Sequence, residues 1–176
     1  MHTVKQIVIY PIKGLGGISL QKANAFVEGF EHDRRWMLVD ADGNFLSQRN
    51  NAKMALFSTR IIDRGIKVSY GNDEAIVPFD QHLNVDKNVT VWDSQLKAQE
   101  VDPILSEWFS DHLNLECSLV SMTNVSHRVK TLAEAPFETK VSFAECSSMV
   151  VLQSGRTFAP FKLKFSYENL GCHPCL

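Results

Sequence analysis

A lysine followed by glycines stands where the first predicted strand of the chain ends. Residues 3–10 have the pattern of a strand in which Ile7 and Ile9 share one face, and Pro11 ends it because proline cannot donate a ladder hydrogen bond. Lys13 comes next, and three of the four residues after it are glycine, which lets the backbone bend and approach a ligand closely. A cation on such a turn could hold a phosphate or another anion. A solvated turn lysine is the alternative.

Arginines are the next candidates for anion binding. Two adjacent arginines, of which Arg34 is the first, open a predicted strand over residues 34–40, and strand alternation turns one of them inward. An inward arginine keeps its charge and needs an anion or a carboxylate partner, and the neighbouring Asp33 is the simpler partner. Arg49 ends the predicted return strand of the next hairpin and would lie near Arg34. Together with Lys13, these two arginines predict an oxyanion-binding cluster.

Other candidate residues have simpler interpretations. Ser147 and Ser148 precede an apolar run and could present hydroxyl groups at a strand start, although capping and turn formation are commoner roles. The basic residues 127–130 are interpreted as a solvated loop. Cys172 and Cys175 form a CxxC pair without a second pair at zinc-site spacing, so a disordered tail is the simpler interpretation. The sequence has no Walker loop and no GxSxG, HExxH or GxGxxG motif.

Bulk properties narrow the class of protein. The chain has 176 residues, 44% of them hydrophobic, which suits one domain or two small packed units. Its formal net charge is -2, so it lacks the basic excess that drives nucleic-acid binding. No apolar run approaches the roughly 18 residues of a membrane span, and the N-terminus lacks the apolar stretch of a signal peptide. We expect a cytoplasmic protein that binds neither nucleic acid nor membranes.

Short strands joined by turns dominate the predicted elements. They cover residues 3–10, 34–40, 45–49, 66–70, 75–79, 89–92, 96–101, 115–121 and 141–143. Asp102 and Pro103 predict the start of a helix that continues to about residue 112. Its predicted apolar face carries Ile104, Leu105, Trp108, Phe109 and Leu113. Residues 124–139 are predicted to be a loop. The predicted fold class is mainly β with few helices, a β-barrel of the α+β class.

These segments together resemble the motifs of a known family. Residues 10–14 (YPIKG) resemble the (H/Y)PVKS opening of MOSC-family proteins. Residues 29–36 (GFEHDRRW) are similar to the family's G…DRxW strand, and residues 42–49 (DGNFLSQR) resemble its DGxFLTAR hairpin. Later segments match in the same order, so that the resemblance covers residues 3–145. Each motif alone is weak, whereas the ordered set is fairly specific.

The resemblance implies a cofactor and particular roles for residues. MOSC-family proteins bind a molybdenum cofactor (molybdopterin), whose pterin carries a phosphate. Lys13 and Arg34 fall where the family contacts this anionic cofactor, and Arg49 belongs to the same predicted cluster. Ser147 and Ser148 resemble a second contact segment. The implied fold is the MOSC N-terminal β-barrel.

The resemblance also implies an activity and a domain arrangement. Relatives reduce N-hydroxylated compounds or transfer sulfur, so a small-molecule substrate and an electron-transfer protein partner are expected. Residues 1–122 would form the N-terminal β-barrel domain. Residues 123–176 would be a truncated or divergent start of the MOSC domain, because they lack the family's RPN segment, and the chain would then be inactive. Gly14 stands where the family usually has serine. The alternative is a non-catalytic β-barrel module that binds an anionic small molecule or a protein partner.

Overall fold

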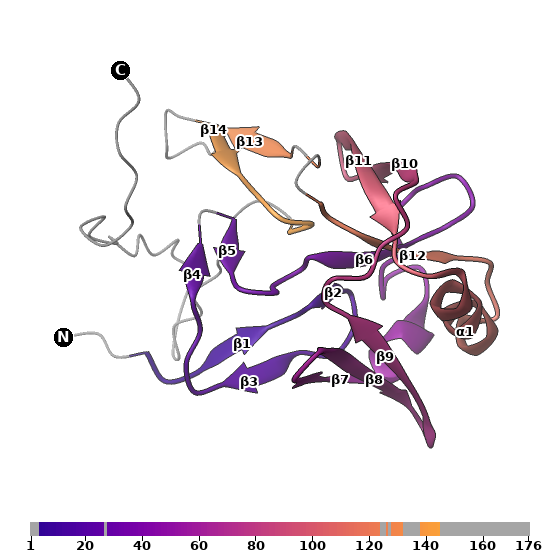
Figure 1. Cartoon of the computed structure of the whole chain (residues 1–176), viewed down its shortest axis with the longest axis horizontal. Coiled ribbons are helices and arrows are strands. Elements are labelled where there is room, and N and C mark those ends of the chain that lie inside the picture. Colours follow the sequence, from indigo (N-terminus) through magenta and orange to yellow (C-terminus); the bar gives the residue numbers. More distant parts are fainter. Residues whose placement is uncertain (1–3, 27, 124–125, 127, 132–137, 145–176) are drawn as a thin grey trace.

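The chain folds mainly into short β-strands (Figure 1). The computed structural model describes residues 4–26, 28–123, 126, 128–131 and 138–144. Within this part of the chain, one α-helix and one short 3₁₀ helix, η1 (Ala52–Leu56), accompany the strands. The predicted fold class, mainly β with few helices, is therefore confirmed.

The largest sheet has five strands in the order β10-β11-β12-β6-β2. In that order, they are β10 (Asp86–Val91), β11 (Ser94–Glu100), β12 (Ser118–Ser121), β6 (Trp36–Val39) and β2 (Ile12–Lys13). Neighbouring strands run antiparallel, except that β2 runs parallel to β6. The parallel pair sets Lys13 opposite Met37, and it places the end of β2 next to the first residues of β6.

Strand β6 is buried on both faces and separates two hydrophobic cores. Trp36 and Leu38 belong to one core, whereas Met37 and Val39 belong to the other. The alternation predicted for this strand is thus present, but both faces are covered, so all four side chains are buried. The strand begins at Trp36 and not at residue 34 as predicted.

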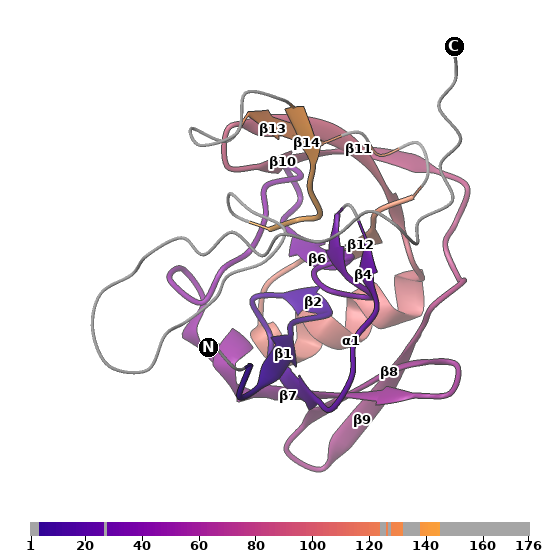
Figure 2. The ribbon, with the colours of Figure 1, turned by 90° about the vertical axis from the view of Figure 1, so that its left-hand side faces the viewer.

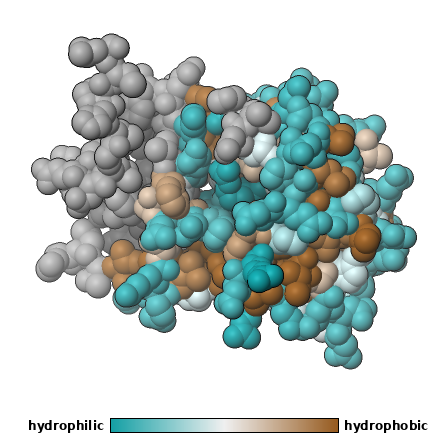
Figure 3. Space-filling model, viewed as in Figure 1, coloured by the Kyte–Doolittle hydropathy of each residue, from teal (hydrophilic) through white to brown (hydrophobic). Residues whose placement is uncertain are grey.

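The other strands form smaller antiparallel units around this sheet. A meander consists of β7 (Phe57–Ile62), β8 (Gly65–Tyr70) and β9 (Asp73–Pro78). The remaining pairs are β1 (Ile7–Ile9) with β3 (Ile18–Leu20), β4 (Ala25–Phe26) with β5 (Gly29–Phe30), and β13 (Val129–Thr131) with β14 (Glu138–Lys140). Figure 3 shows hydrophobic residues along the lower part of the face in view, where Figure 1 places β1, β3 and β7.

Helix α1 (Pro103–Leu113) begins where the sequence predicts, because an Asp102 carboxylate oxygen accepts the Ile104 N–H at 2.8 Å. Figure 2 shows α1 between the large sheet and the meander, and Phe109 and Leu113 are buried there. Ile104, predicted on the same face, is 75% exposed. At 100° per residue it lies about 140° from Phe109 and about 180° from Leu113 around the helix.

Among the helices that the structure describes, none has the length and hydrophobicity of a membrane span.

The hairpin predicted after β6 is shorter than expected. Its turn forms, and the Gly43 N–H donates to the Asp40 carbonyl oxygen at 3.0 Å. Within the described residues, the arms then pair through an isolated bridge between Val39 and Phe45 and not through a continuous ladder. The chain turns away from the sheet soon afterwards. Arg49 therefore lies on a loop and not at the end of a strand.

Part of the predicted loop over residues 124–139 forms the β13–β14 hairpin. Arg128, directly before β13, is only 2% exposed, and its guanidinium donates to the carbonyl oxygens of Ser142, at 2.8 Å, and Ala144. The prediction of a solvated basic loop is wrong for Arg128. Its hydrogen bonds fix the segment after β14. Residues 141–143 are buried there but form no strand.

A buried carboxylate ties the end of β1 to the loop before β6. Asp33 is 4% exposed, and its Oδ1 accepts a hydrogen bond from the Tyr10 N–H at 2.8 Å. Its Oδ2 accepts hydrogen bonds from the Arg34 guanidinium, with Nε at 2.9 Å. The Arg34 N–H donates to the Tyr10 carbonyl oxygen at 2.8 Å, and the Arg34 carbonyl oxygen accepts the Phe143 N–H at 3.1 Å. This network holds β2 in register beside β6.

We expect Asp33→Ala to lower the free energy of unfolding by about 2–4 kcal/mol, because it removes a buried carboxylate that accepts hydrogen bonds from the Tyr10 N–H and from the partly buried Arg34 guanidinium. Chemical denaturation followed by circular dichroism measures the change. Asp42→Ala, at an exposed turn position, is the control and should change it by less than ~0.5 kcal/mol. An Asp33→Ala protein as stable as the wild type would show that this network does not organise the strands.

Candidate anion-binding site

A cavity of about 390 Å³ lies at the end of β2, and all three cations of the predicted cluster line it. Lys13 comes from β2, Arg34 from the loop before β6, and Arg49 from the loop after the short hairpin. The other described residues of its wall are Tyr10, Gly14, Phe45, Leu46, Ser47, Gln48 and Trp92. None of these described lining residues is acidic. The three cations thus lie in the wall of one cavity, and their role in binding an anion stays a prediction.

Lys13 lies in β2 and not in the predicted turn, because a strand resumes directly after Pro11. The turn begins one residue later, at Gly14. The Lys13 Nζ lies 5.0 Å from the centroid of the Phe45 ring and 5.6 Å from that of the Trp92 ring. Both distances are within the range of cation–π attraction, so two rings hold the ammonium group at the cavity wall.

Arg34 reaches the cavity from a residue with a left-handed backbone, with φ of 52°. Because Arg34 precedes the strand, strand alternation does not set its direction. The ion pair with Asp33, the simpler interpretation from the sequence, is present. The guanidinium therefore enters the cavity wall together with a carboxylate partner behind it, and its charge is partly offset there. Lys13 and Arg49 are the other two cations of the described lining.

Arg49 lies on a loop that a side-chain hydrogen bond ties to the end of β2. The Gln48 Nε2 donates to the Gly14 carbonyl oxygen at 2.8 Å. The Arg49 Cζ lies 5.4 Å from the centroid of the Trp92 ring. The loop thus carries a cation to the same aromatic side chain that Lys13 contacts.

Gly14 has a backbone conformation that other residues rarely adopt, with φ of +84°. A Cβ atom placed there would lie 2.9 Å from the Met54 Cε. The methionine end is flexible and could move, but the backbone strain would remain. Glycine is therefore the residue that this turn accepts most easily.

Sequence reasoning missed the aromatic part of the wall. The sequence predicts Trp92 only as the end of a strand and Phe45 only as part of a hairpin. In the structure their rings lie 4.8 Å apart, and both contact the Lys13 ammonium. Gln48 was also missed. Trp92 is the last residue of a predicted strand and directly precedes Asp93 in the turn that follows, and a tryptophan at such a turn is a signal that could have marked it, since small and polar residues are usual there.

The other two predicted contact residues, Ser147 and Ser148, lie outside the described residues, and so does the CxxC pair of Cys172 and Cys175. Within the part of the chain that the structure describes, no group of three or more His, Cys, Asp or Glu side chains could hold a metal ion. The cations in the wall of the 390 Å³ cavity could attract an anionic group.

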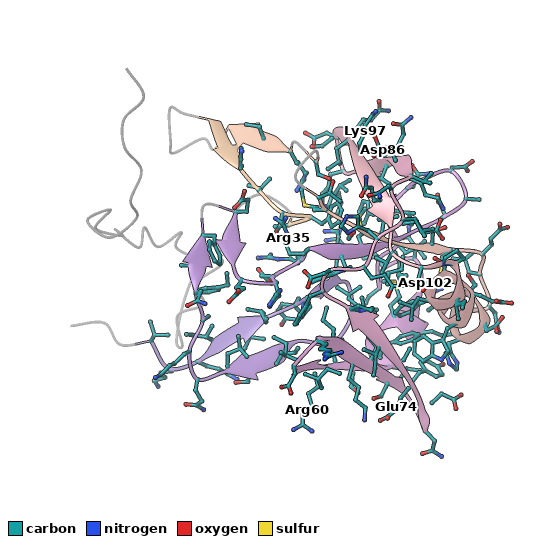
Figure 4. The ribbon with its side chains drawn as sticks, in the orientation of Figure 1. Arg35, Arg60, Glu74, Asp86, Lys97 and Asp102 are labelled. Carbon is teal, nitrogen blue, oxygen red and sulfur yellow. The ribbon has the colours of Figure 1, made fainter. Side chains whose placement is uncertain are left out.

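A second, larger cavity of about 640 Å³ holds Arg35, which Figure 4 labels at the start of β6. In its wall the His32 ring stacks on the Phe79 ring, with centroids 4.0 Å apart and an angle of 4° between the planes. Burial lowers the pKa of His32, Glu31 opposes this shift, Arg35 adds to it, and Asp80 opposes it more weakly. His32 also has a left-handed backbone, with φ of 62°.

The lowered pKa of His32 predicts that the free energy of unfolding falls in acid. Above pH 6.5, His32 is neutral in both the folded and the unfolded chain and contributes no pH dependence. As the pH falls below 6.5, the unfolded chain takes up the proton first, so the free energy of unfolding falls until the lowered pKa of the folded state is passed. We expect His32→Asn to reduce this fall, because asparagine tolerates the left-handed backbone and does not titrate. Urea denaturation at a series of pH values below 6.5 measures the free energy of unfolding of both proteins.

The matched control is His82→Asn, which changes another histidine of the same cavity wall and should leave the pH dependence of the wild type in place. An equal fall in His32→Asn and wild-type protein would show that His32 does not carry the effect.

Curated proteins with similar sequences include molybdenum cofactor sulfurases and a mitochondrial amidoxime-reducing component. The chain is 25% identical over 130 residues to a molybdenum cofactor sulfurase of Oryza sativa subsp. japonica, which covers 71% of this chain and 16% of that protein. It is 26% identical over 160 residues to mitochondrial amidoxime-reducing component 1 of Mus musculus, which covers 85% of this chain and 47% of that protein. The chain thus spans less than half the length of either relative.

Among solved structures, the solution structure of a Bordetella bronchiseptica protein aligns over 59% of this chain and 90% of its own, with 14% identity and a TM-score of 0.45. The sequence model of the MOSC N-terminal beta barrel domain matches residues 1–116, which include every described residue of the cavity lining. The chain belongs to the MOSC N-terminal beta barrel domain family.

Proposed function

We propose that the cavity lined by Lys13, Arg34 and Arg49 binds the phosphate group of a molybdenum cofactor. The observation that carries this proposal is the convergence of three cations from three separate segments on one concavity. The distant relation to molybdenum cofactor sulfurases supports the choice of ligand.

The cavity wall suits a phosphate in chemistry as well as in charge. A guanidinium can donate two parallel hydrogen bonds to phosphate oxygens, and an ammonium acts as a compact point charge beside them. Trp92 and Phe45 keep water from one side of the Lys13 ammonium. Electrostatic attraction is stronger where water is excluded. Lys13 and Arg49 would therefore hold the phosphate, and Arg34, paired with Asp33, would fix its orientation.

The bound cofactor would supply the redox or sulfur chemistry of its molybdenum centre. This chain's described residues would hold and orient the phosphate end. We further propose a small-molecule substrate of the N-hydroxylated class, or a role in sulfur transfer, with electrons delivered by a protein partner in the cytoplasm. The alternative is a non-catalytic module for an anionic small molecule. It is favoured by the described lining itself, which offers cations and aromatic rings but neither thiols nor imidazoles.

We expect phenyl phosphate, a phosphate monoester used as a probe, to bind the wild-type chain in isothermal titration calorimetry. Lys13→Gln and Arg49→Gln should each weaken binding by about tenfold to a hundredfold, because each removes a charge-assisted hydrogen bond. Arg60→Gln is the matched control: Arg60 is an exposed cation on β7, labelled in Figure 4, and its loss should leave the affinity unchanged. Equal losses in all three variants, or no binding by the wild type, would contradict the proposal.

Molybdenum content separates the two candidate functions. Protein purified from a host that makes the cofactor should carry molybdenum in elemental analysis, and Lys13→Gln should lower the ratio of metal to protein. Phenyl phosphate binding without molybdenum would favour the non-catalytic module over the cofactor-binding protein.

A further inference from the structure

Trp92 occupies a backbone position that is unfavourable for a bulky side chain. The register of Val91 with Ser94 closes the β10–β11 hairpin with a loop of two residues, Trp92 and Asp93. The φ of Trp92 is 57°, in the left-handed region where glycine, asparagine and aspartate are usual. Backbone strain of this kind persists where the surrounding structure enforces it, and it gathers at functional sites.

The Trp92 ring lies within cation–π distance of two cations of the cavity wall. The Lys13 Nζ is 5.6 Å from its centroid and the Arg49 Cζ is 5.4 Å from it. The Phe45 ring supports it at 4.8 Å with a tilt of 52°. Trp92 lines the cavity and remains 37% exposed, so it is not a core residue that happens to reach the surface.

We infer that Trp92 is the positioning residue of the anion site, and this inference rests on the proposed anion binding. The negative face of an indole ring attracts cations, so one ring draws the ammonium of Lys13 and the guanidinium of Arg49 to the same wall. Both cations have long flexible stems, and side chains that are already ordered lose less entropy when a ligand binds. Trp92 acts on the anion through these two cations and does not replace either of them.

Substitution of Trp92 separates positioning from simple packing. Trp92→Ala and Trp92→Gly both remove the ring, and we expect both to weaken phenyl phosphate binding by about fivefold to thirtyfold, the factor that corresponds to two lost cation–π contacts. Trp92→Phe keeps a ring and should recover most of the affinity. Phe26→Ala is the control, because Phe26 is an exposed ring that lines the larger cavity and not this one.

Thermal stability supplies a readout that a purely structural role would not produce. Trp92→Gly should melt at a higher temperature than Trp92→Ala, because glycine adopts the left-handed backbone without strain. The two variants should nevertheless bind phenyl phosphate equally weakly. If affinity instead followed melting temperature across the three Trp92 variants, Trp92 would be a structural residue and the inference would be wrong.

The side-chain Nε–H resonance of Arg49 tests the inference without any ligand. Its chemical shift in the free wild-type protein should carry the ring current of Trp92, and it should move in Trp92→Gly while Trp92→Phe retains part of the shift. An unmoved resonance would overturn the inference. Undiminished phenyl phosphate binding by Trp92→Gly would also overturn it and leave the proposed anion site standing. A wild type that does not bind would instead contradict the anion site, and the resonance alone would then decide whether Trp92 positions Arg49.

Discussion

The buried carboxylate of Asp33 is the group on which both the strand arrangement and the site depend. One of its oxygens accepts the Tyr10 N–H and the other accepts the Arg34 guanidinium, so it joins the segment that leads into β2 to the segment that leads into β6. A carboxylate in this position must be paired, since an uncompensated buried charge is costly. The same pairing that satisfies Asp33 also sets Arg34 beside the strand that carries Lys13.

The site forms at the edge of a sheet whose centre is fully occupied by packing. Both faces of β6 contribute to hydrophobic cores, which leaves no room for a ligand there. The cavity instead opens where β2 ends and two loops approach it, one with Arg34 and one with Arg49. The Trp92 ring closes this arrangement from the β10–β11 turn. The sheet itself thus carries Lys13, and loops beside it carry Arg34 and Arg49, an arrangement common for binding sites.

Local features were predictable from the sequence. The Asp102 cap predicts the start of α1, and the turn glycine at position 43 predicts a reversal of the chain. Arg49 was expected near Arg34 because a regular hairpin would bring it there; the cavity does contain both residues, but a loop and not a strand carries Arg49 to it. Non-local features were not predictable. The parallel pairing of β2 with β6 and the burial of Arg128 depend on contacts between distant segments. The position of the Trp92 ring depends on a left-handed backbone that tryptophan rarely adopts.

A crystal structure of the chain grown with phenyl phosphate would test the central claim most directly. The account predicts the phosphate group in the cavity beside Trp92, with its oxygens within hydrogen-bonding distance of the Lys13 ammonium and the Arg49 guanidinium. It also predicts that the Asp33–Arg34 pair stays intact when the phosphate binds. A phosphate bound elsewhere on the protein, with this cavity empty at saturating concentration, would contradict the account.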